Sequence, residues 1–252
     1  MLLSIDHLKG YKIEALDGDI GHVDSFLFED TNWMVRYLVV DTRNFLIGKK
    51  VLISPRCITS MDKKGLRVNL KMDEVRNSPL IDTDKPVSRR MEKELHSFYG
   101  WPYYWETSTS MGMAPPPPSY PMHEYDDEYE EKGGDPHLRS TDEIIGYRIE
   151  NGNETTGILN DFIIHTGYWD IPFAVVDTVK SKNNRKLVLI ITDWVHDIIW
   201  EENSMQVNVP KRVIEGLPKF NAHEPINPVH EEIIYDYYGM PQQKHLYHNA
   251  AV

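Results

Sequence analysis

The sequence is poor in several features that mark particular classes of protein. Its single cysteine, Cys57, excludes an internal disulfide and is typical of a reducing compartment. The longest apolar runs, such as Leu187 to Ile191, are far shorter than the about 20 residues that span a bilayer. The opening residues also lack the pattern of a secretory signal. We therefore expect a cytoplasmic protein without a membrane span.

Positive charge is scarce as well. The chain has 27 Lys and Arg against 39 Asp and Glu, a net charge of −12. Non-specific binding to nucleic acid depends on Lys and Arg, so this charge balance disfavours a nucleic-acid partner. The densest basic group is expected in a hairpin loop and consists of Lys180, Lys182, Arg185 and Lys186. It indicates either an acidic or RNA partner or an ordinary solvated turn.

Sequence patterns of catalytic sites are missing too. The chain has no G-x-S-x-G elbow, no Walker lysine loop and no H-E-x-x-H motif. Asp17-x-Asp19-x-Gly21 lacks the further ligands of a calcium loop and is interpreted as a hairpin turn. Cys57 is interpreted as a buried structural thiol. We predict a protein that is not an enzyme, with no catalytic residues and no cofactor.

Four histidines near the C-terminal end are the candidates for a metal site. They are His223, His230, His245 and His248. Metal sites take three or four ligands from a preorganised frame, which a terminal segment rarely supplies. No metal site is predicted.

The most informative feature that is present is a long internal repeat. The stretch from Gly10 to Thr42 aligns without a gap to the stretch from Gly146 to Thr178, and both end in Val-Val-Asp-Thr. The two copies are offset by 136 residues, a period much longer than the about 20–50 residues of a solenoid unit, so the repeat indicates a duplicated domain. The expected domains are residues 1–106 and 138–243, a Pro-rich and acidic linker at 107–137, and a tail at 244–252.

Each copy contains patterns typical of short β-strands. Strands are expected around a turn at Asp17-Gly18 in the first copy and at Asn151-Gly152 in the second. Gly21 and Gly157 fall inside strand patterns and predict a bulge or a barrel corner. The strongest strand candidates begin at Trp33 and Trp169, which we expect in equivalent, largely buried positions. The fold class predicted is mainly β, with two small antiparallel barrels.

A short α-helix is expected after each set of strands, at about 88–99 and 227–238. Ser88 is a good N-cap, and Gly100 with Pro102 gives a stop signal. Met91, Leu95 and Phe98 share one helical face. Arg89-Arg90 conflicts with the helix dipole and hints at an acidic partner.

The strings Asp17-Gly18-Asp19-Ile20-Gly21 and Arg36-Tyr37-Leu38-Val39-Val40-Asp41-Thr42 resemble a PRC-barrel domain. This family includes the cytoplasmic domain of the photosynthetic reaction centre H subunit, and a related domain occurs in ribosome maturation factors. The chain is similar to bacterial proteins with two such barrels, each followed by a helix ending in Tyr-Gly-x-Pro. The resemblance implies a non-catalytic protein-interaction or scaffold protein. The alternative it implies is an RNA-binding or ribosome-assembly factor.

The expected partner surface is an aromatic cluster that follows the first helix. Its large rings are Trp101, Tyr103, Tyr104 and Trp105. They are either an interface hot spot or a clasp that closes over a barrel of the chain. The helices and this cluster are expected to be buried against another barrel, within the chain or in a homodimer.

Overall fold

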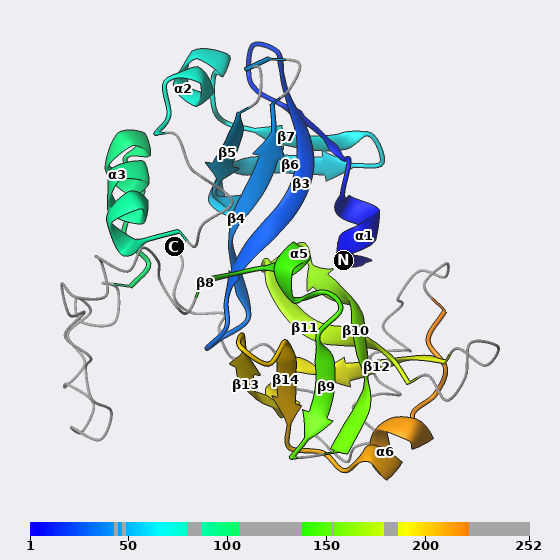
Figure 1. Cartoon of the computed structure of the whole chain (residues 1–252). Coiled ribbons are helices and arrows are strands. Elements are labelled where there is room, and N and C mark those ends of the chain that lie inside the picture. Colours follow the sequence, from blue (N-terminus) through cyan, green and yellow to red (C-terminus); the bar gives the residue numbers. More distant parts are fainter. Residues whose placement is uncertain are drawn as a thin grey trace, which may run out of the picture. The chain divides into compact units, whose positions relative to one another are not determined.

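The computed structural model describes residues 1–42, 45–46, 49–79, 87–105, 138–152, 154–178 and 186–221. This part of the chain is mainly β, as predicted, with a few short helices (Figure 1). It divides into two compact units. We call Leu8–Glu143 the N-terminal unit, and Met1–His7 together with Ile144–Val252 the C-terminal unit.

The N-terminal unit is a sheet built on one long strand, β3 (Asp19–Glu29). The order across the sheet is β6-β7-β2-β3-β4-β5, and β8 pairs with the end of β3. The remaining strands are β2 (Lys12–Glu14), β4 (Met34–Asp41), β5 (Lys50–Ile53), β6 (Ile58–Asp62), β7 (Gly65–Val68) and β8 (Leu138–Ser140).

The C-terminal unit is built in the same order on β10 (Glu154–His165). Its path is β13-β14-β9-β10-β11-β12, and β1 pairs with the end of β10. The strands are β1 (Leu2–Ser4), β9 (Arg148–Asn151), β11 (Asp170–Asp177), β12 (Leu187–Ile191), β13 (Val195–Ile199) and β14 (Ser204–Val207).

The sheets are mixed, which corrects the prediction of purely antiparallel ones. β2 pairs with β7 and β9 pairs with β14 in parallel register, while the other pairs within each unit are antiparallel. In each unit a hairpin is formed by two strands, β6 and β7 or β13 and β14. The second strand of the hairpin pairs with the edge of β2 or β9. Within the described residues no pairing joins β5 to β6 or β12 to β13, so the sheet is not closed.

The compact units do not follow the ends of the repeat. Met1–His7 belongs to the C-terminal unit, where β1 pairs with β10, and residues 138–143 belong to the N-terminal unit, where β8 pairs with β3. The chain passes from one unit to the other within two single-turn helices, α1 (Ile5–Leu8) and α5 (Thr141–Ile144). Each predicted domain thus contributes its first strand to the unit that holds most of the other predicted domain.

The predicted helix at 88–99 is confirmed as α3 (Arg89–Tyr99). The Ser88 side chain accepts a hydrogen bond from the Met91 amide, and Gly100 ends the helix in the left-handed region at φ 68°. The other helices are short: α2 (Met72–Arg76), α6 (Lys211–Gly216) and the 3-10 turns η1 (Pro55–Cys57) and η2 (Thr192–Trp194). The predicted helix at 227–238, the linker at 107–137 and the tail lie outside the described residues.

The two strand glycines lie at bulges, as predicted. The ladder register shifts beside Gly21 and beside Gly157. A Cβ at Gly21, where φ is +149°, would lie 2.1 Å from the Asp41 carbonyl oxygen. A Cβ at Gly157 would lie 2.7 Å from the Asp177 oxygen. Only glycine lets the backbones approach this closely.

Trp33 and Trp169 are expected to begin strands, but their backbone is not extended. Each lies in the hairpin turn before its strand, with φ 58° and 59°, and donates its amide to the carbonyl four residues earlier. Trp33 is buried and stacks on Phe28 at 5.1 Å, while Trp169 is only half-buried. The positions are equivalent, but only Trp33 is buried. Tertiary packing holds both residues in a conformation that a strand pattern does not indicate.

Candidate functional site

The candidate site lies beneath α3, where one face of the helix covers the sheet of the N-terminal unit (Figure 1). Leu95 is buried in a cluster with Tyr37, Leu52 and Leu138, and Met91 and Tyr99 pack against it. These helical residues recur four positions apart, which gives a helix one apolar stripe. Phe98, predicted to share this face, is 42% exposed, and Tyr99 takes its place.

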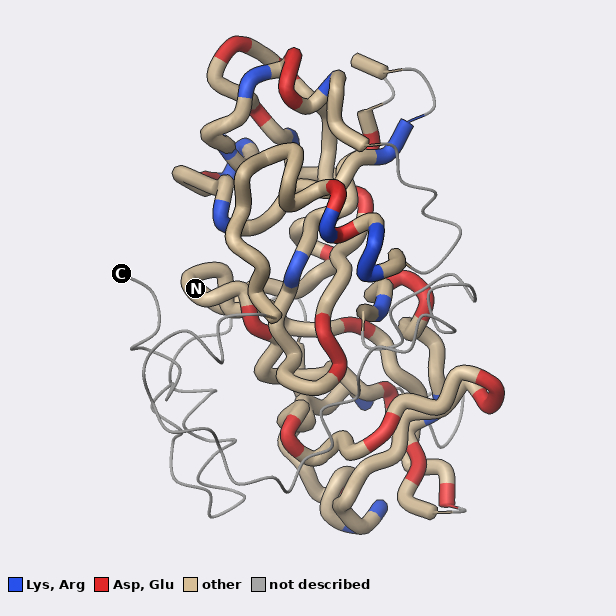
Figure 2. Tube along the Cα trace, turned by 90° about the vertical axis from the view of Figure 1, so that its left-hand side faces the viewer, with Lys and Arg blue, Asp and Glu red and all other residues tan. Residues whose placement is uncertain are grey.

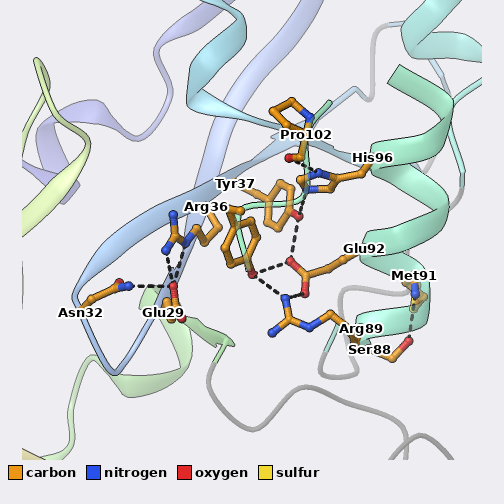
Figure 3. A network of polar contacts seen from close by, with 11 residues as sticks. Glu29, Asn32, Arg36, Tyr37, Ser88, Arg89, Met91, Glu92, His96 and Pro102 are labelled. Atoms are coloured by element: carbon orange, nitrogen blue, oxygen red, sulfur yellow. Dashed lines mark hydrogen bonds and ion pairs between the residues drawn. The ribbon is translucent and has the colours of Figure 1, made fainter. Parts of the chain in front are cut away.

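A buried carboxylate interrupts this apolar face. Glu92 is completely buried, and its Oε1 accepts hydrogen bonds from Tyr37 Oη at 2.8 Å and Tyr104 Oη at 2.7 Å. Its Oε2 accepts from Arg89 at 2.8 Å, and Arg89 also donates to Tyr104 Oη at 3.1 Å. Figure 3 shows Arg89 and Glu92 of α3 converging with Tyr37 of β4. A charge buried this deeply is tolerated because it is paired and hydrogen-bonded.

His96 extends the network by one turn of α3. Its Nδ1 donates to the Pro102 carbonyl at 2.9 Å, because a carbonyl can only accept. In the neutral imidazole Nε2 is then an acceptor, and it lies 2.8 Å from Tyr37 Oη. The single hydroxyl proton of Tyr37 therefore stands between two acceptors, Glu92 and His96.

Burial dominates the acid–base behaviour of the network. It raises the pKa of Tyr37 well above its usual range, and the neighbouring Glu92 charge acts in the same direction. Burial and Glu92 likewise raise the pKa of Tyr104. Burial lowers the pKa of His96, partly offset by its hydrogen bonds to backbone carbonyls. Both tyrosines are thus held as neutral donors and His96 as a neutral imidazole.

The predicted aromatic cluster is anchored to this network. Arg36 of β4, which also pairs with Glu29, lies over the Tyr104 ring at 4.0 Å. Arg89 lies over the Trp105 ring at 4.2 Å. Such contacts between cations and ring faces are favourable. The interpretation as a clasp accounts for these interactions of Tyr104 and Trp105.

The other two rings complete the segment. Trp101 stacks on Tyr99 of α3 at 4.3 Å, and Tyr103 stacks on His96 at 5.6 Å. Trp101, Tyr103, Tyr104 and Trp105 are all half-buried, so each keeps part of its surface accessible. Each of these rings is therefore partly packed within the N-terminal unit and partly accessible.

The arginines at the start of α3 have partners within the N-terminal unit. Arg89 pairs with Glu92, three residues further along the helix, and Arg90 pairs with the exposed Glu94 at 3.3 Å. Carboxylates on the same helix therefore offset the unfavourable placement of these cations near the N-terminus.

The predicted basic loop is only partly described. Lys180, Lys182 and Arg185 lie outside the described residues. Lys186 Nζ donates to the Glu215 carbonyl at 2.7 Å. Figure 2 shows Lys and Arg as short blue segments interspersed with red acidic ones along the described chain.

The remaining candidate residues have structural roles. Asp17 accepts from the Met72 amide at 2.8 Å at the start of α2, and Asp19 pairs with Lys12 at 3.2 Å. Cys57 is 3% exposed, and burial raises its pKa to about 11, so it is a thiol at neutral pH. In the described ranges no three His, Cys, Asp or Glu residues are grouped to hold a metal ion. His223, His230, His245 and His248 lie outside those ranges.

Sequence reasoning missed the centre of the site, namely Tyr37, Glu92 and His96. A signal was present, since Glu92 and His96 fall on the same helical face as Leu95 and must be buried if the helix packs on the sheet. The donors to Glu92 come from residues 37 and 104, far apart in sequence, so only the tertiary structure reveals them.

In comparisons with known proteins, no protein-family model and no curated protein sequence matches this chain. Among the helices of the described residues, none has the length and apolar character needed to cross a membrane.

Proposed function

We propose that the chain is a non-catalytic scaffold protein built from two PRC-type barrels, and that it binds a protein partner. The sequence resemblance supports the barrel assignment, as does the same strand order about β3 and about β10. One observation carries the binding role: the buried network holds a segment of four half-buried aromatic rings in place.

The chemistry of this segment suits protein recognition. Tyr and Trp supply large, stiff contact surfaces and are enriched in interface hot spots. Because Glu92 and His96 anchor the segment through Tyr104 and the Pro102 carbonyl, little conformational entropy is lost when a partner binds. Tyr103 and Trp105 lie beside one another, with ring centroids 4.9 Å apart, and form the proposed contact surface.

Quantitative partner capture from the native cell tests the proposal. Full-length protein and the variants Tyr103→Ala and Trp105→Ala serve as baits, and bound proteins are quantified by mass spectrometry. One protein partner should be retained in high salt by the unmodified chain and reduced at least about tenfold by either variant. Phe98→Ala, which removes an exposed ring of α3 outside the segment, is the matched control and should retain the partner.

Thermal unfolding of each bait shows whether the variants remain folded. Equal capture by all folded baits would contradict the assignment of the surface. Capture of RNA that is lost as salt increases would instead support the ribosome-assembly alternative.

A further inference from the structure

The C-terminal unit contains a docking site for an extended segment that comes from the start of the chain. Leu2, Leu3 and Ser4 pair in antiparallel register with His165, Ile164 and Ile163. The Met1 carbonyl accepts from the Thr166 amide at 2.9 Å and from its hydroxyl at 3.1 Å. Side chains secure the segment as well, since Leu2 is 7% exposed and Ile5 is completely buried.

An equivalent site occurs in the N-terminal unit. Leu138, Arg139 and Ser140 pair with Glu29, Phe28 and Leu27. The Thr141 hydroxyl accepts from the Phe26 amide at 3.2 Å, and Leu138 is buried. Leu-x-Ser is common to both inserted strands. The same mode of strand addition is thus used twice, each time at the end of the longest strand.

Neither inserted strand is joined to its acceptor by a short turn. Residues 8–143 separate Met1–His7 from the rest of the C-terminal unit. The segment pairs with β10 through main-chain hydrogen bonds, and these do not depend on which polypeptide supplies the strand. Exchange of an identical element between two copies is a low-cost route to a dimer.

We propose that the edge of β10 at Ile163–His165 is an exchangeable strand site, and that its partner is Met1–His7 of a second copy of the chain. Own-chain and second-copy segments compete for the site. Exchange increases with protein concentration, because only the second-copy arrangement is bimolecular. Exchange requires the segment to leave its own site, so it takes place during folding or slow local opening.

Disulfide trapping between two full-length variants tests this proposal. Leu2 and His165 are direct register partners, so we place Leu2→Cys in one chain and His165→Cys in another. The native Cys57 is buried and does not compete. The two chains, one of them isotopically labelled, are unfolded and refolded together over a range of concentrations and then oxidised. Mass spectrometry should find a crosslink between positions 2 and 165 of different chains, and its yield should increase at least about fivefold from 1 to 100 μM.

Two controls make the result decisive. One chain carrying both Leu2→Cys and His165→Cys should form the disulfide internally at low concentration, which shows that the pair can be bridged. Leu16→Cys, at a position that is 65% exposed, should give no crosslink with the His165→Cys chain. An internal disulfide in the double variant with no interchain crosslink at any concentration would overturn the proposal. If the double variant formed no internal disulfide, the pairing of Leu2 with His165 would be contradicted, and the proposed strand site with it.

Discussion

Glu92 is the centre of the buried polar network that packs α3 against the sheet. Its carboxylate is completely buried and is held by Arg89 and the hydroxyls of Tyr37 and Tyr104. Breaking a buried pair by removing one partner is costly because it leaves the other charge without compensation. The network therefore makes the docked position of the helix sensitive to a single side chain.

The variant Glu92→Gln tests this dependence with almost no change in volume. We expect it to lower the free energy of unfolding by about 3–5 kcal/mol, because the buried Arg89 loses the Glu92 charge that pairs with it. Glu94→Gln on the same helix removes an exposed pair with Arg90 and should cost no more than about 1 kcal/mol. Urea unfolding measures both. Equal, small effects of the two substitutions would contradict a buried ionic network.

The folded protein should lose stability as the pH falls below about 6.5, because of His96. Burial lowers the pKa of His96 in the folded state, with Arg56 and Arg89 acting in the same direction. The unfolded chain therefore binds the proton first, and stability falls between the unfolded pKa and the lower folded one. The midpoint of urea unfolding, measured from pH 8 to pH 5, should fall less for His96→Gln than for the unmodified chain. If the urea midpoints of the two proteins changed in parallel with pH, His96 would not contribute to the pH dependence of stability.

At the level of elements, the bulged strands β3 and β10 shape both units. Gly21 lets β3 approach the Asp41 carbonyl, where a side chain would not fit. Gly10 also has a positive φ, +80°, but a Cβ there would lie more than 4 Å from the neighbouring atoms that the structure describes. Substitutions at the two glycines therefore distinguish the effect of a positive φ from the effect of close contact with a neighbouring strand.

We expect Gly21→Ala to destabilise the fold by about 3 kcal/mol or more, since the bulge and the neighbouring strand must both shift. Gly10→Ala should lower the free energy of unfolding by only about 1–2 kcal/mol, because alanine is strained in the left-handed region but meets no neighbouring atom of the described residues. Thermal unfolding of the two variants gives the comparison. If Gly21→Ala destabilised the protein no more than Gly10→Ala does, the backbone would relieve the close contact with Asp41 easily.

At the level of the whole molecule, β1 and β8 link the two halves of the sequence, because each of these strands belongs to the unit formed mainly by the other half. Residues 1–7 complete the C-terminal unit, and residues 138–143 complete the N-terminal unit. The halves are therefore expected to depend on each other even though each carries a full copy of the repeat.

Cleavage within the linker tests this dependence. A protease site inserted between residues 115 and 130 of the full chain allows cutting after folding. We expect the two fragments to elute together in size-exclusion chromatography and to separate only when the protein unfolds, because each fragment supplies a buried strand to the other's unit. Ile5→Asp, which places a charge at a completely buried position, should weaken the association. Fragments that separate yet stay folded would show that the exchanged strands are dispensable.

Local patterns alone determined much of this protein. The repeat, the β-rich composition, the bulge glycines and the helix limits at Ser88 and Gly100 follow from residues close together in sequence, where turn chemistry and side-chain periodicity act. Only the tertiary structure decided the parallel pairs, the left-handed Trp33 and Trp169, the contacts of Glu92 and the unit to which each first strand belongs. The physical reason is that two related copies offer each first strand two similar acceptor edges, and long-range packing selects between them.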